Sequence, residues 1–534
     1  MHGDHGSMGG CVVCDAARTH GEELAGSGLS RSSLLRRGAL AAAAATLTAG
    51  PLATAARAHG GGGGHGAPRG RRVAIDASWI LTVENGALKL LRDHVAVIEG
   101  DRIAELRPRS RPWRGPRVHA AGQLLLPGFI SGHTHVAGGT PTRGIIEGGR
   151  SFARPLELAD ALSDDDLDAL TAFNLAELLR GGCTTQLEMA LSLKQAESYA
   201  RVAARFAARG YPGGMIPGIH RLFPIWFRTA DQPLFDSVPA TLAEIEANLA
   251  FGRRWNGAED GRILPMITPH ATDTHTPETM AAMAAAAREL GHGIHLHLSQ
   301  SANETATVLR LWGKRPVEWL DDFGMYDGPL FGAHLSGIDL VADPPILAAK
   351  GAVYAHCPSG GGAGGGTQPW PELLAAGVRT NIGIDTHSND YVENLKLAVL
   401  YGQARRSLIA ATSPVPLANP TIWDAVRAAT LVPATALGRE DLGRIAPGAK
   451  ADLVSVDVSG LLVGTGAVPP EPLNNLLYAH GLAVRHVMTD GHWQVHDGRL
   501  VIADERRLAR RAGRVVEALW AQLASEGWFT PTPM

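Results

Sequence analysis

Apolar and polar residues alternate on two length scales in the central part of this 534-residue chain. Short apolar runs that end at Gly, Pro or a polar cluster are typical of buried strands, whereas apolar positions repeating every three or four residues indicate helices. We predict eight central strands, at residues 124–130, 184–189, 214–220, 263–268, 293–298, 330–334, 353–356 and 380–385. Amphipathic segments such as 164–182 and 277–292 separate them. This alternation predicts an α/β fold with a (β/α)8 TIM-type barrel over residues 127–439.

The segments on either side of this central part have a different pattern. Residues 73–126 and 440–505 consist of short β-type runs broken by turn residues, as in "VAIDASWILTV" and "ADLVSVDVSG". The most economical arrangement joins these two flanks, which lie more than 300 residues apart, in one composite β-sandwich domain. Residues 506–534 are predicted to form a C-terminal helix and tail.

Residues 1–58 are predicted to be an N-terminal extension that contains an export signal. A basic stretch at 31–37 precedes an alanine-rich apolar stretch at 38–56, and the Ala-x-Ala sequence at 56–58 is a candidate cleavage site. The segment resembles a twin-arginine leader, so we expect Tat-like export to the cell envelope or the exterior. A membrane anchor is the open alternative, because so short and alanine-rich an apolar run is marginal for crossing a bilayer.

Composition excludes several classes of partner. The formal net charge is -3 and the pI is about 6.7, so the chain lacks the basic signal expected for nucleic acid or an anionic membrane. Four cysteines are too few to crosslink a chain of this length. Cys11 and Cys14 form a CxxC pair that we interpret as part of a disordered extension with incidental metal affinity, with a functional zinc site as the alternative. Residues 59–72, rich in Gly and His, predict a flexible linker.

Candidate chemistry begins at the end of the first central strand, in "LLLPGFISGHTHV" (124–136). His133 and His135 are two residues apart, so both imidazoles point to one face of a strand and can bind one divalent ion together. Active sites of (β/α)8 barrels lie at the C-terminal ends of the strands. At the other strand ends the sequence places His270, His297, His334, His356 and Asp385. The alternative, core histidines bonded to backbone groups, is favoured for one histidine alone but not for the whole set.

Together these segments resemble the amidohydrolase superfamily, in particular its branch of cyclic-amidine deaminases and triazine chlorohydrolases. The resemblance covers about residues 73–505 and depends on the order and spacing of short motifs. These motifs are "LPGFISGHTHV", "ELLRGGCTTQLEM", "ITPHATDTHTPETM", "HLHLSQS", "GAHLSGID", "AHCPSG", "NIGIDTHS", and the tail "ATLVPATALG" followed by "GRIAPGAKADLVSVD". The resemblance implies a metal-dependent hydrolase built on a barrel.

The resemblance also implies that one divalent metal ion is held by His133, His135, His297 and Asp385. The predicted fourth strand offers His270 and no lysine, so the bridging lysine of two-metal relatives has no counterpart. Zinc suits three imidazoles, one carboxylate and a water, and ferrous iron accepts the same ligands. His295 is the alternative ligand on the fifth strand; His297 is preferred because the family motif has a polar residue three places later, which is Gln300 here.

Further roles follow from the same resemblance. A metal-bound water has its pKa lowered to about 7, which makes a hydroxide available at neutral pH. Asp385 would accept its proton and pass it to the leaving group, His334 would orient the hydroxide or polarise the attacked atom, and His270 would hold the substrate. His356 is a further candidate for substrate contact. Trp226, in an aromatic segment after the third strand, would wall a flat or apolar substrate, with an ordinary surface loop as the alternative.

The glycine-rich segment 359–370, "SGGGAGGGTQPW", follows the seventh predicted strand. It lacks the lysine and hydroxyl pair of a phosphate-binding loop. We interpret it as a mobile loop over the mouth of the site.

Gln300 is the main departure from the relatives, whose ring deaminases carry a glutamate there to protonate a ring nitrogen. Glutamine donates a hydrogen bond but cannot transfer a proton. We therefore predict a metal-dependent amidohydrolase that hydrolyses a non-peptide carbon–nitrogen bond of a small, cyclic substrate, with aminoheterocycle deamination and amide, lactam or cyclic urea hydrolysis both open. An exported metal- or ligand-binding protein on an impaired barrel is the alternative. The expected partner is a small molecule, without nucleic acid or stable membrane insertion after signal cleavage, and a homo-oligomer is left open.

Overall fold

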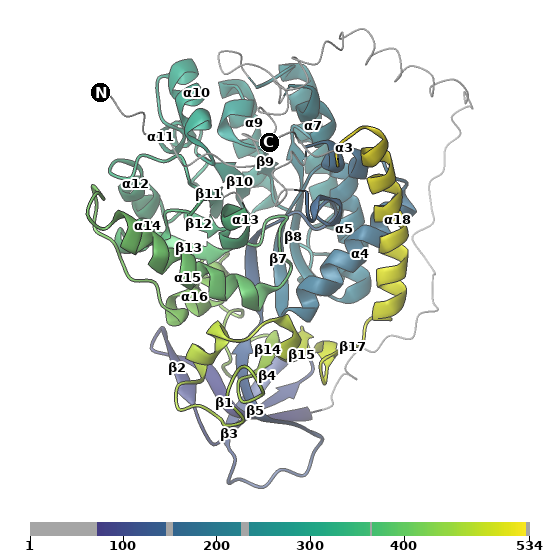
Figure 1. Cartoon of the computed structure of the whole chain (residues 1–534), viewed down its shortest axis with the longest axis vertical. Helices are drawn as coiled ribbons and strands as arrows, with labels where there is room; N and C mark the ends of the chain where they lie inside the picture. Colours follow the sequence, from purple (N-terminus) through teal and green to yellow (C-terminus); the bar gives the residue numbers. More distant parts are fainter. Residues whose placement is uncertain (1–71, 146–152, 226–233, 364–365, 530–534) are drawn as a thin grey trace.

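The computed structural model describes residues 72–145, 153–225, 234–363 and 366–529. The predicted export signal, the Cys11/Cys14 pair and the linker therefore lie outside the described residues. Figure 1 shows a large α/β body above a smaller β-rich part, with the long helix α18 (Glu505–Ser525) along one side of the body. No helix in the described ranges is both long and apolar enough to cross a membrane.

The smaller part is a nine-stranded sheet built from both flanks of the chain. The first flank contributes β1 (Arg72–Glu84), β2 (Ala87–Leu91), β3 (His94–Glu99), β4 (Arg102–Pro108) and β5 (Arg117–Pro127). The second contributes β14 (Leu453–Asp457), β15 (Val484–Thr489), β16 (His492–His496) and β17 (Arg499–Leu500). The strand order is β17-β16-β15-β14-β5-β1-β3-β4, with β2 paired to β1. The two flanks meet where β5 and β14 pair antiparallel.

The central part contains two four-stranded parallel sheets. One has the order β6 (Phe129–Thr134), β7 (Cys183–Ala190), β8 (Arg209–Ile216) and β9 (Thr268–Pro269). The other has the order β10 (Ile294–Leu298), β11 (Leu330–His334), β12 (Val353–His356) and β13 (Arg379–Ile382). Parallel bridges join the sheets at both ends, between Ile267 and Ile294 and between Thr134 and Asp385.

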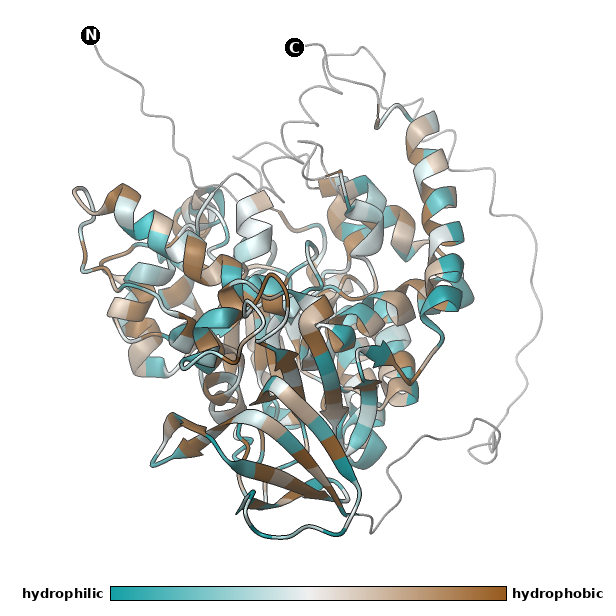
Figure 2. Cartoon of the chain, turned by 60° about the horizontal axis from the view of Figure 1, so that its bottom comes forward, coloured by the Kyte–Doolittle hydropathy of each residue, from teal (hydrophilic) through white to brown (hydrophobic). Residues whose placement is uncertain are grey.

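Helices flank these strands (Figure 1). The longer ones are α3 (Ala153–Asp160), α4 (Asp164–Arg180), α5 (Leu193–Phe206), α7 (Val238–Trp255), α9 (Pro277–Leu290), α10 (Ala302–Trp312), α12 (Asp343–Lys350), α15 (Tyr391–Ile409) and α16 (Ile422–Ala429). The short ones are α6 (Ile219–Leu222), α8 (Ala258–Gly261), α11 (Pro316–Asp321), α13 (Pro358–Ala363), α14 (Trp370–Ala375) and α17 (Leu431–Ala436). Figure 2 shows hydrophobic bands on an otherwise hydrophilic α18, in keeping with an amphipathic helix packed by one face.

Several predicted strand boundaries were wrong. The expected strand 124–130 is two strands: β5 ends at Pro127 in the nine-stranded sheet, and β6 starts at Phe129 in the central part. Gly128 makes this passage feasible, because a Cβ atom there would lie 2.2 Å from the Thr184 hydroxyl. The expected strand 263–268 shares only Thr268 with β9. The expected strand 214–220 is β8, which starts earlier, at Arg209, and ends at Ile216, so that His220 lies on α6.

A buried ion network connects the central part to the small sheet. Arg209 on β8 donates to both carboxylate oxygens of Asp452, at 3.1 and 3.2 Å, and to Asp490 at 2.8 Å. Lys450 reaches the same Asp490 at 2.9 Å. The side chain of Arg209 is fully buried, so its charge depends on compensation by these carboxylates, and the Gly261 carbonyl oxygen adds a contact at 3.5 Å. The network links the start of β8, at Arg209, to Asp452 directly before β14 and to Asp490 directly after β15.

Candidate metal centre

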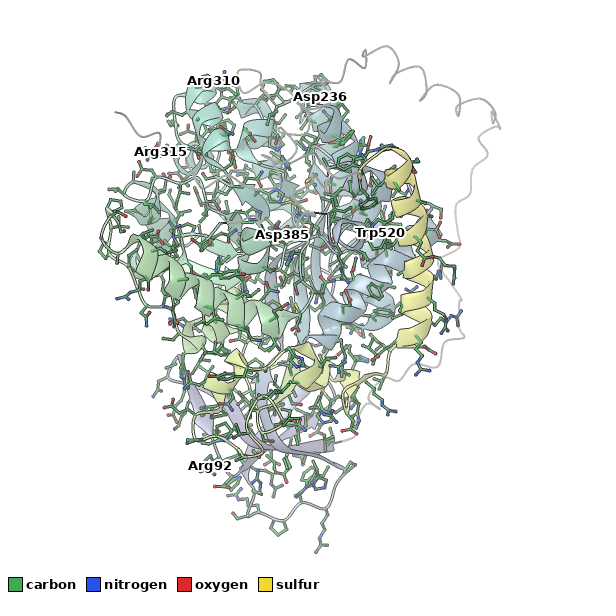
Figure 3. The ribbon with its side chains drawn as sticks, viewed as in Figure 1. Arg92, Asp236, Arg310, Arg315, Asp385 and Trp520 are labelled. Carbon is green, nitrogen blue, oxygen red and sulfur yellow. The ribbon has the colours of Figure 1, made fainter. Side chains whose placement is uncertain are left out.

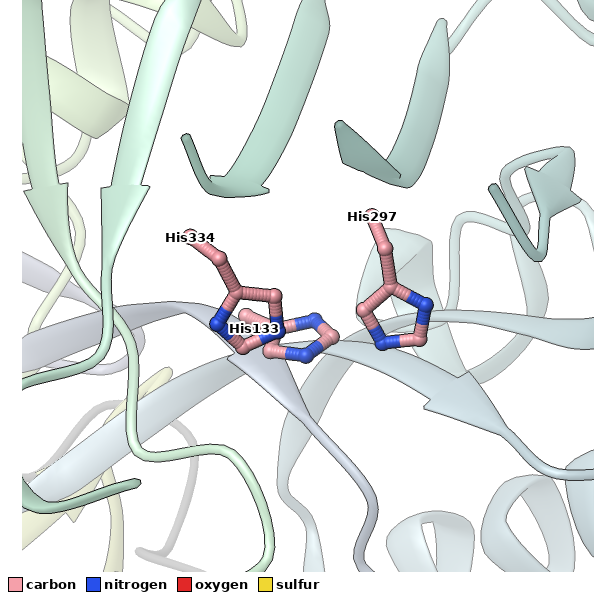
Figure 4. A group of neighbouring side chains, drawn as sticks. All are labelled: His133, His297 and His334. Carbon is pink, nitrogen blue, oxygen red and sulfur yellow. The ribbon is translucent and has the colours of Figure 1, made fainter. Parts of the chain in front are cut away.

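Five predicted site residues meet at the C-terminal ends of the central strands. They are His133 on β6, His135 directly after it, His297 on β10, His334 at the end of β11 and Asp385 after β13. Asp385 is held in place by backbone bonds: its N–H donates to the His133 carbonyl at 3.1 Å, and its carbonyl accepts from His135 at 3.4 Å. Figure 3 shows Asp385 in the middle of the molecule, and Figure 4 shows the rings of His133, His297 and His334 converging.

The spacing of their polar atoms suits a single metal ion. His135 Nε2 lies 3.4 Å from His297 Nε2 and 3.6 Å from Asp385 Oδ1, and His133 Nε2 lies 3.8 Å from the same Oδ1. Two ligands about 2.1 Å from a tetrahedral zinc ion are roughly 3.4 Å apart. All four side chains are buried. The three distances above are close to that spacing, and His133, His297 and His334 also place one ring nitrogen each within 4.8 Å of one another.

The tautomers of two imidazoles support this fit. His135 Nδ1 lies 2.6 Å from the Met189 carbonyl, and His297 Nδ1 lies 2.7 Å from the His270 carbonyl. Because a carbonyl oxygen only accepts, each Nδ1 carries the proton and each Nε2 presents a lone pair. Burial lowers the pKa of both rings, that of His297 well below its ordinary value, so both are neutral at pH 7. Two buried lone pairs that face each other at 3.4 Å repel unless a cation lies between them.

His295 lies behind the candidate ligands rather than among them. Its Nε2 is 2.7 Å from His133 Nδ1, and burial lowers its pKa to about 3. When His133 Nδ1 donates to this neutral ring, His133 Nε2 presents its lone pair toward Asp385. His133 Nε2 has no hydrogen-bond partner within the described ranges. His297, not His295, is thus the imidazole of β10 that reaches His135.

The backbone is strained where the strands end at this site. Ser299, His334 and Asp385 have φ values of +42°, +76° and +60°, in the left-handed region that non-glycine residues rarely adopt. Such positions cost about 1–3 kcal/mol each and are retained where the surrounding structure requires them. Gly360 of α13 lies against this turn: a Cβ atom there would be 2.8 Å from Asp385 Oδ2. The segment predicted to be a mobile loop thus includes a short helix that packs on Asp385.

His334 and His270 each lie against the His297 ring. His334 Nε2 lies 4.0 Å from Asp385 Oδ2, and its ring stacks on that of His297 at 5.3 Å. The His270 ring is also 5.3 Å from that of His297, and burial lowers the pKa of His270 to about 3. His356 is buried and stacks on Trp370. Trp226 lies outside the described residues.

Gln300 is buried beside Glu304, an acid that was not predicted from the sequence. Its backbone N–H donates to Glu304 Oε2 at 2.7 Å, and the Thr272 N–H donates to Glu304 Oε1 at 3.1 Å. Burial, and then the charge of Asp273, raise the pKa of Glu304 to about 8. A protonated carboxyl therefore stands next to Gln300 at neutral pH. Glu304 is in the first turn of α10, where the sequence pattern indicates only a helix start.

Two further residues near the site were also missed. Glu188 accepts the Val136 N–H at 2.9 Å and contacts the Thr134 hydroxyl at 2.7 Å, and burial raises its pKa to about 8. Gln368 contacts His334, His356 and the backbone of Cys357. Neither residue has a motif of its own, because each acts through a contact with a segment far away in the sequence.

A second histidine cluster lies on the small sheet. His486 Nε2 and His496 Nδ1 are 3.6 and 3.3 Å from the two carboxylate oxygens of Asp497. However, His486 Nδ1 accepts the Asp497 N–H at 3.4 Å. A histidine that binds metal through Nε2 needs its proton on Nδ1, where it would oppose that N–H. We therefore assign no ion to this cluster.

Comparison with known proteins points to one family. A model described as "Amidohydrolase family" matches residues 124–494. A 5-methylthioadenosine/S-adenosylhomocysteine deaminase of Pelotomaculum thermopropionicum is 30% identical over 407 residues, which cover 72% of this chain and 84% of the relative. A 5'-deoxyadenosine deaminase of Methanosarcina mazei is 28% identical over 465 residues, which cover 85% and 99%.

Solved structures agree in fold. A triazine hydrolase of Arthrobacter aurescens superposes with a TM-score of 0.71 at 20% identity, covering 84% of this chain and 99% of that one. An adenosine deaminase of Xanthomonas campestris with bound zinc has a TM-score of 0.68 at 24% identity, covering 85% and 100%. Identities this low establish the fold alone, and that fold is a TIM-barrel-type α/β arrangement.

Proposed function

Because the chain belongs to the amidohydrolase family, we propose that it removes an amino group hydrolytically from a small nitrogen heterocycle with the help of one divalent metal ion. The family and the deaminase relatives identify a hydrolase that acts on carbon–nitrogen bonds other than peptide bonds. The observation that carries the proposal is the convergence of three imidazole nitrogens and one carboxylate oxygen, with His334 on the other side of Asp385.

We further propose that the two parallel sheets are halves of one (β/α)8 barrel over residues 127–439, and that the nine-stranded sheet is the composite β-sandwich domain. The parallel bridges at both ends of the two sheets support the first part. The pairing of β5 with β14 supports the second, because it joins the two flanks of the chain.

The proposed metal ligands are His133, His135, His297 and Asp385. Three neutral imidazoles and one carboxylate suit zinc, and ferrous iron is the alternative. When bound, the ion would supply a water acidic enough to act as nucleophile near pH 7. The carbonyls of Met189 and His270 hold two of the imidazoles in the tautomer that ligation needs.

The neighbouring residues would position the substrate and handle protons. Asp385 directs Oδ1 toward the imidazoles and Oδ2 toward His334, so it can hold a proton taken from the attacking water and release it toward the leaving group. His334 would orient the nucleophile or polarise the attacked atom. His270 and His356, both neutral because burial lowers the pKa of each to about 3, would contact the substrate as hydrogen-bonding groups.

Gln300 favours a second candidate, the hydrolysis of an amide, lactam or cyclic urea. Such a reaction needs no protonated ring nitrogen, so it does not require the proton transfer that a glutamine side chain cannot provide. Deamination remains the first choice because the relatives described above are deaminases and because Glu304, whose pKa Asp273 helps to raise, accepts the Gln300 backbone N–H. No observation favours an exported metal or ligand carrier.

Product analysis separates these candidates. The purified chain, loaded with zinc, is offered adenosine derivatives, aminotriazines, lactams and cyclic ureas, and released ammonia is measured together with product mass. Ammonia release from an aminoheterocycle whose ring stays intact supports deamination. Ring opening without such release supports the second candidate, and a loaded enzyme that converts no compound of either kind contradicts both.

Localisation is a separate proposal. The basic, alanine-rich and Ala-x-Ala segments within residues 1–58 favour Tat-like export to the cell envelope or the exterior. The proposed partner is a small molecule.

A further inference from the structure

Gln368, in the glycine-rich segment 359–370 and two residues before α14, lies at the centre of a buried polar network. Its Oε1 is 2.8 Å from the Cys357 backbone nitrogen, 2.9 Å from His356 Nδ1 and 3.2 Å from the Tyr354 hydroxyl. Its Nε2 is 3.3 Å from His334 Nδ1. The Gln368 side chain thus joins the histidines that end β11 and β12.

The backbone of Cys357 determines which way the Gln368 amide points. A backbone N–H can only donate, so the amide atom 2.8 Å away must be the oxygen. The other amide atom is then the NH₂ group, which can only donate. His334 Nδ1 must accept from it, and a neutral His334 therefore carries its proton on Nε2.

The same amide has the opposite effect on His356. Since Gln368 Oε1 only accepts, a ring nitrogen 2.9 Å away must carry a hydrogen, so His356 is protonated on Nδ1. One side chain thus fixes two adjacent histidines in different tautomers. His334 also differs from His135 and His297, whose Nδ1 atoms donate to carbonyls and whose Nε2 atoms present lone pairs.

We propose that Gln368 is a positioning residue that holds His334 as a neutral Nε2–H donor and thereby keeps it out of the metal ligand set. Its side chain contacts no proposed metal ligand in the hydrogen bonds above, and it acts through His334. The link to substrate rests on the proposed function: His334 would present a hydrogen bond to an acceptor atom next to the attacked carbon. The substrate class narrows to rings with a ring nitrogen or carbonyl oxygen beside that carbon.

Nitrogen NMR tests the tautomer directly. The zinc-loaded full chain is labelled with ¹⁵N-histidine, and the His334 signals are identified by their loss in His334→Asn. The wild type should show Nε2 protonated and Nδ1 as the acceptor. In Gln368→Glu the new carboxylate faces His334, so Nδ1 should become protonated. The side-chain amide of Gln403 donates to the Pro420 carbonyl at 2.9 Å, outside the network around Gln368. Gln403→Glu, the same exchange, is therefore the matched control and should leave the His334 signals unchanged.

Kinetics at pH 9, where imidazoles are ordinarily neutral, tests whether loss of the His334 Nε2–H donor slows the reaction. Gln368→Glu should lower kcat by about 100-fold with KM changed by less than about 3-fold, since one donor to the transition state is lost. A wild type with Nδ1 of His334 protonated overturns the proposal, and so does a Gln368→Glu kcat equal to that of Gln403→Glu. The wild-type spectrum needs no turnover, so it decides the tautomer even if no heterocycle is converted and the proposed function fails.

Discussion

Replacing Gln300 with glutamate tests the reaction class, because it changes a hydrogen-bond donor into a group that can transfer a proton. Gln300 is buried, and its backbone contacts Glu304, whose pKa is raised to about 8 by burial and by Asp273. The introduced carboxyl would share this environment, so burial and like charge should hold its pKa above the ordinary value of about 4.3. It should be largely protonated at pH 6.

The expected change in rate depends on the reaction. For ring deamination, a protonated carboxyl can act as general acid, and we expect Gln300→Glu to keep kcat/KM or raise it by on the order of 10-fold. That gain should be present at low pH and lost as pH rises through the pKa of the new carboxyl. For an amide or lactam, added negative charge beside a developing oxyanion should cost at least ~1.4 kcal/mol, or about 10-fold.

The assay is kcat/KM from pH 5 to 9 for ammonia release from aminoheterocycles and for ring opening of lactams. Gln403→Glu provides the control for the same exchange away from the site. A Gln300→Glu enzyme that loses 10-fold or more on aminoheterocycles at pH 6 would refute the reasoning that this environment favours a useful acid. If Gln300→Glu had the same kcat/KM as wild type on every substrate, the result would show that Gln300 does not face the reacting group.

Three further predictions concern stability and processing. Glu188 has its pKa raised from 4.5 to about 8, so the native state retains a proton that the unfolded state loses, and stability should fall as pH rises from about 5 to 9. In urea titrations, Glu188→Gln should reduce this pH-dependent loss of unfolding free energy by up to about 5 kcal/mol. If the unfolding free energies of wild type and Glu188→Gln changed in parallel with pH, the raised pKa of Glu188 would be disproved. Arg209→Met leaves Asp452 and Asp490 with less compensation in a buried site and should lower the free energy of unfolding by about 3–5 kcal/mol; a loss below 1 kcal/mol in urea would contradict this. N-terminal sequencing of exported protein should give a start near His59, whereas a mature chain that retains Cys11 would contradict cleavage.

The family and the bounds of β11 and β12 could be predicted from the sequence because they depend on local signals. The segment around His133 and His135 combines an apolar strand, a glycine and a two-residue spacing, and each of these is visible without tertiary information. The family prediction and the prediction of a hydrolase are confirmed by the family model and the deaminase relatives. The strand at 330–334 was also placed with the bounds that β11 has.

Other features depend on contacts that no local pattern contains. The apolar run 124–130 reads as one strand, yet Gly128 lets the chain leave one sheet and enter another because it passes close to Thr184. The different positions of His295 and His297 depend on contacts with His133 and His135, more than 150 residues earlier. Gln368 reads as part of a loop until folding places its amide between two histidines.

Zinc titration of metal-free enzyme tests the central claim most directly, since one ion held by His133, His135, His297 and Asp385 is proposed to support hydrolysis of a carbon–nitrogen bond. Bound metal and ammonia release are measured in the same samples as zinc is added. We predict that both rise together and reach a plateau at one equivalent per chain, and that His135→Ala neither retains the ion nor releases ammonia. A plateau at two equivalents, or full ammonia release without metal, would contradict the account.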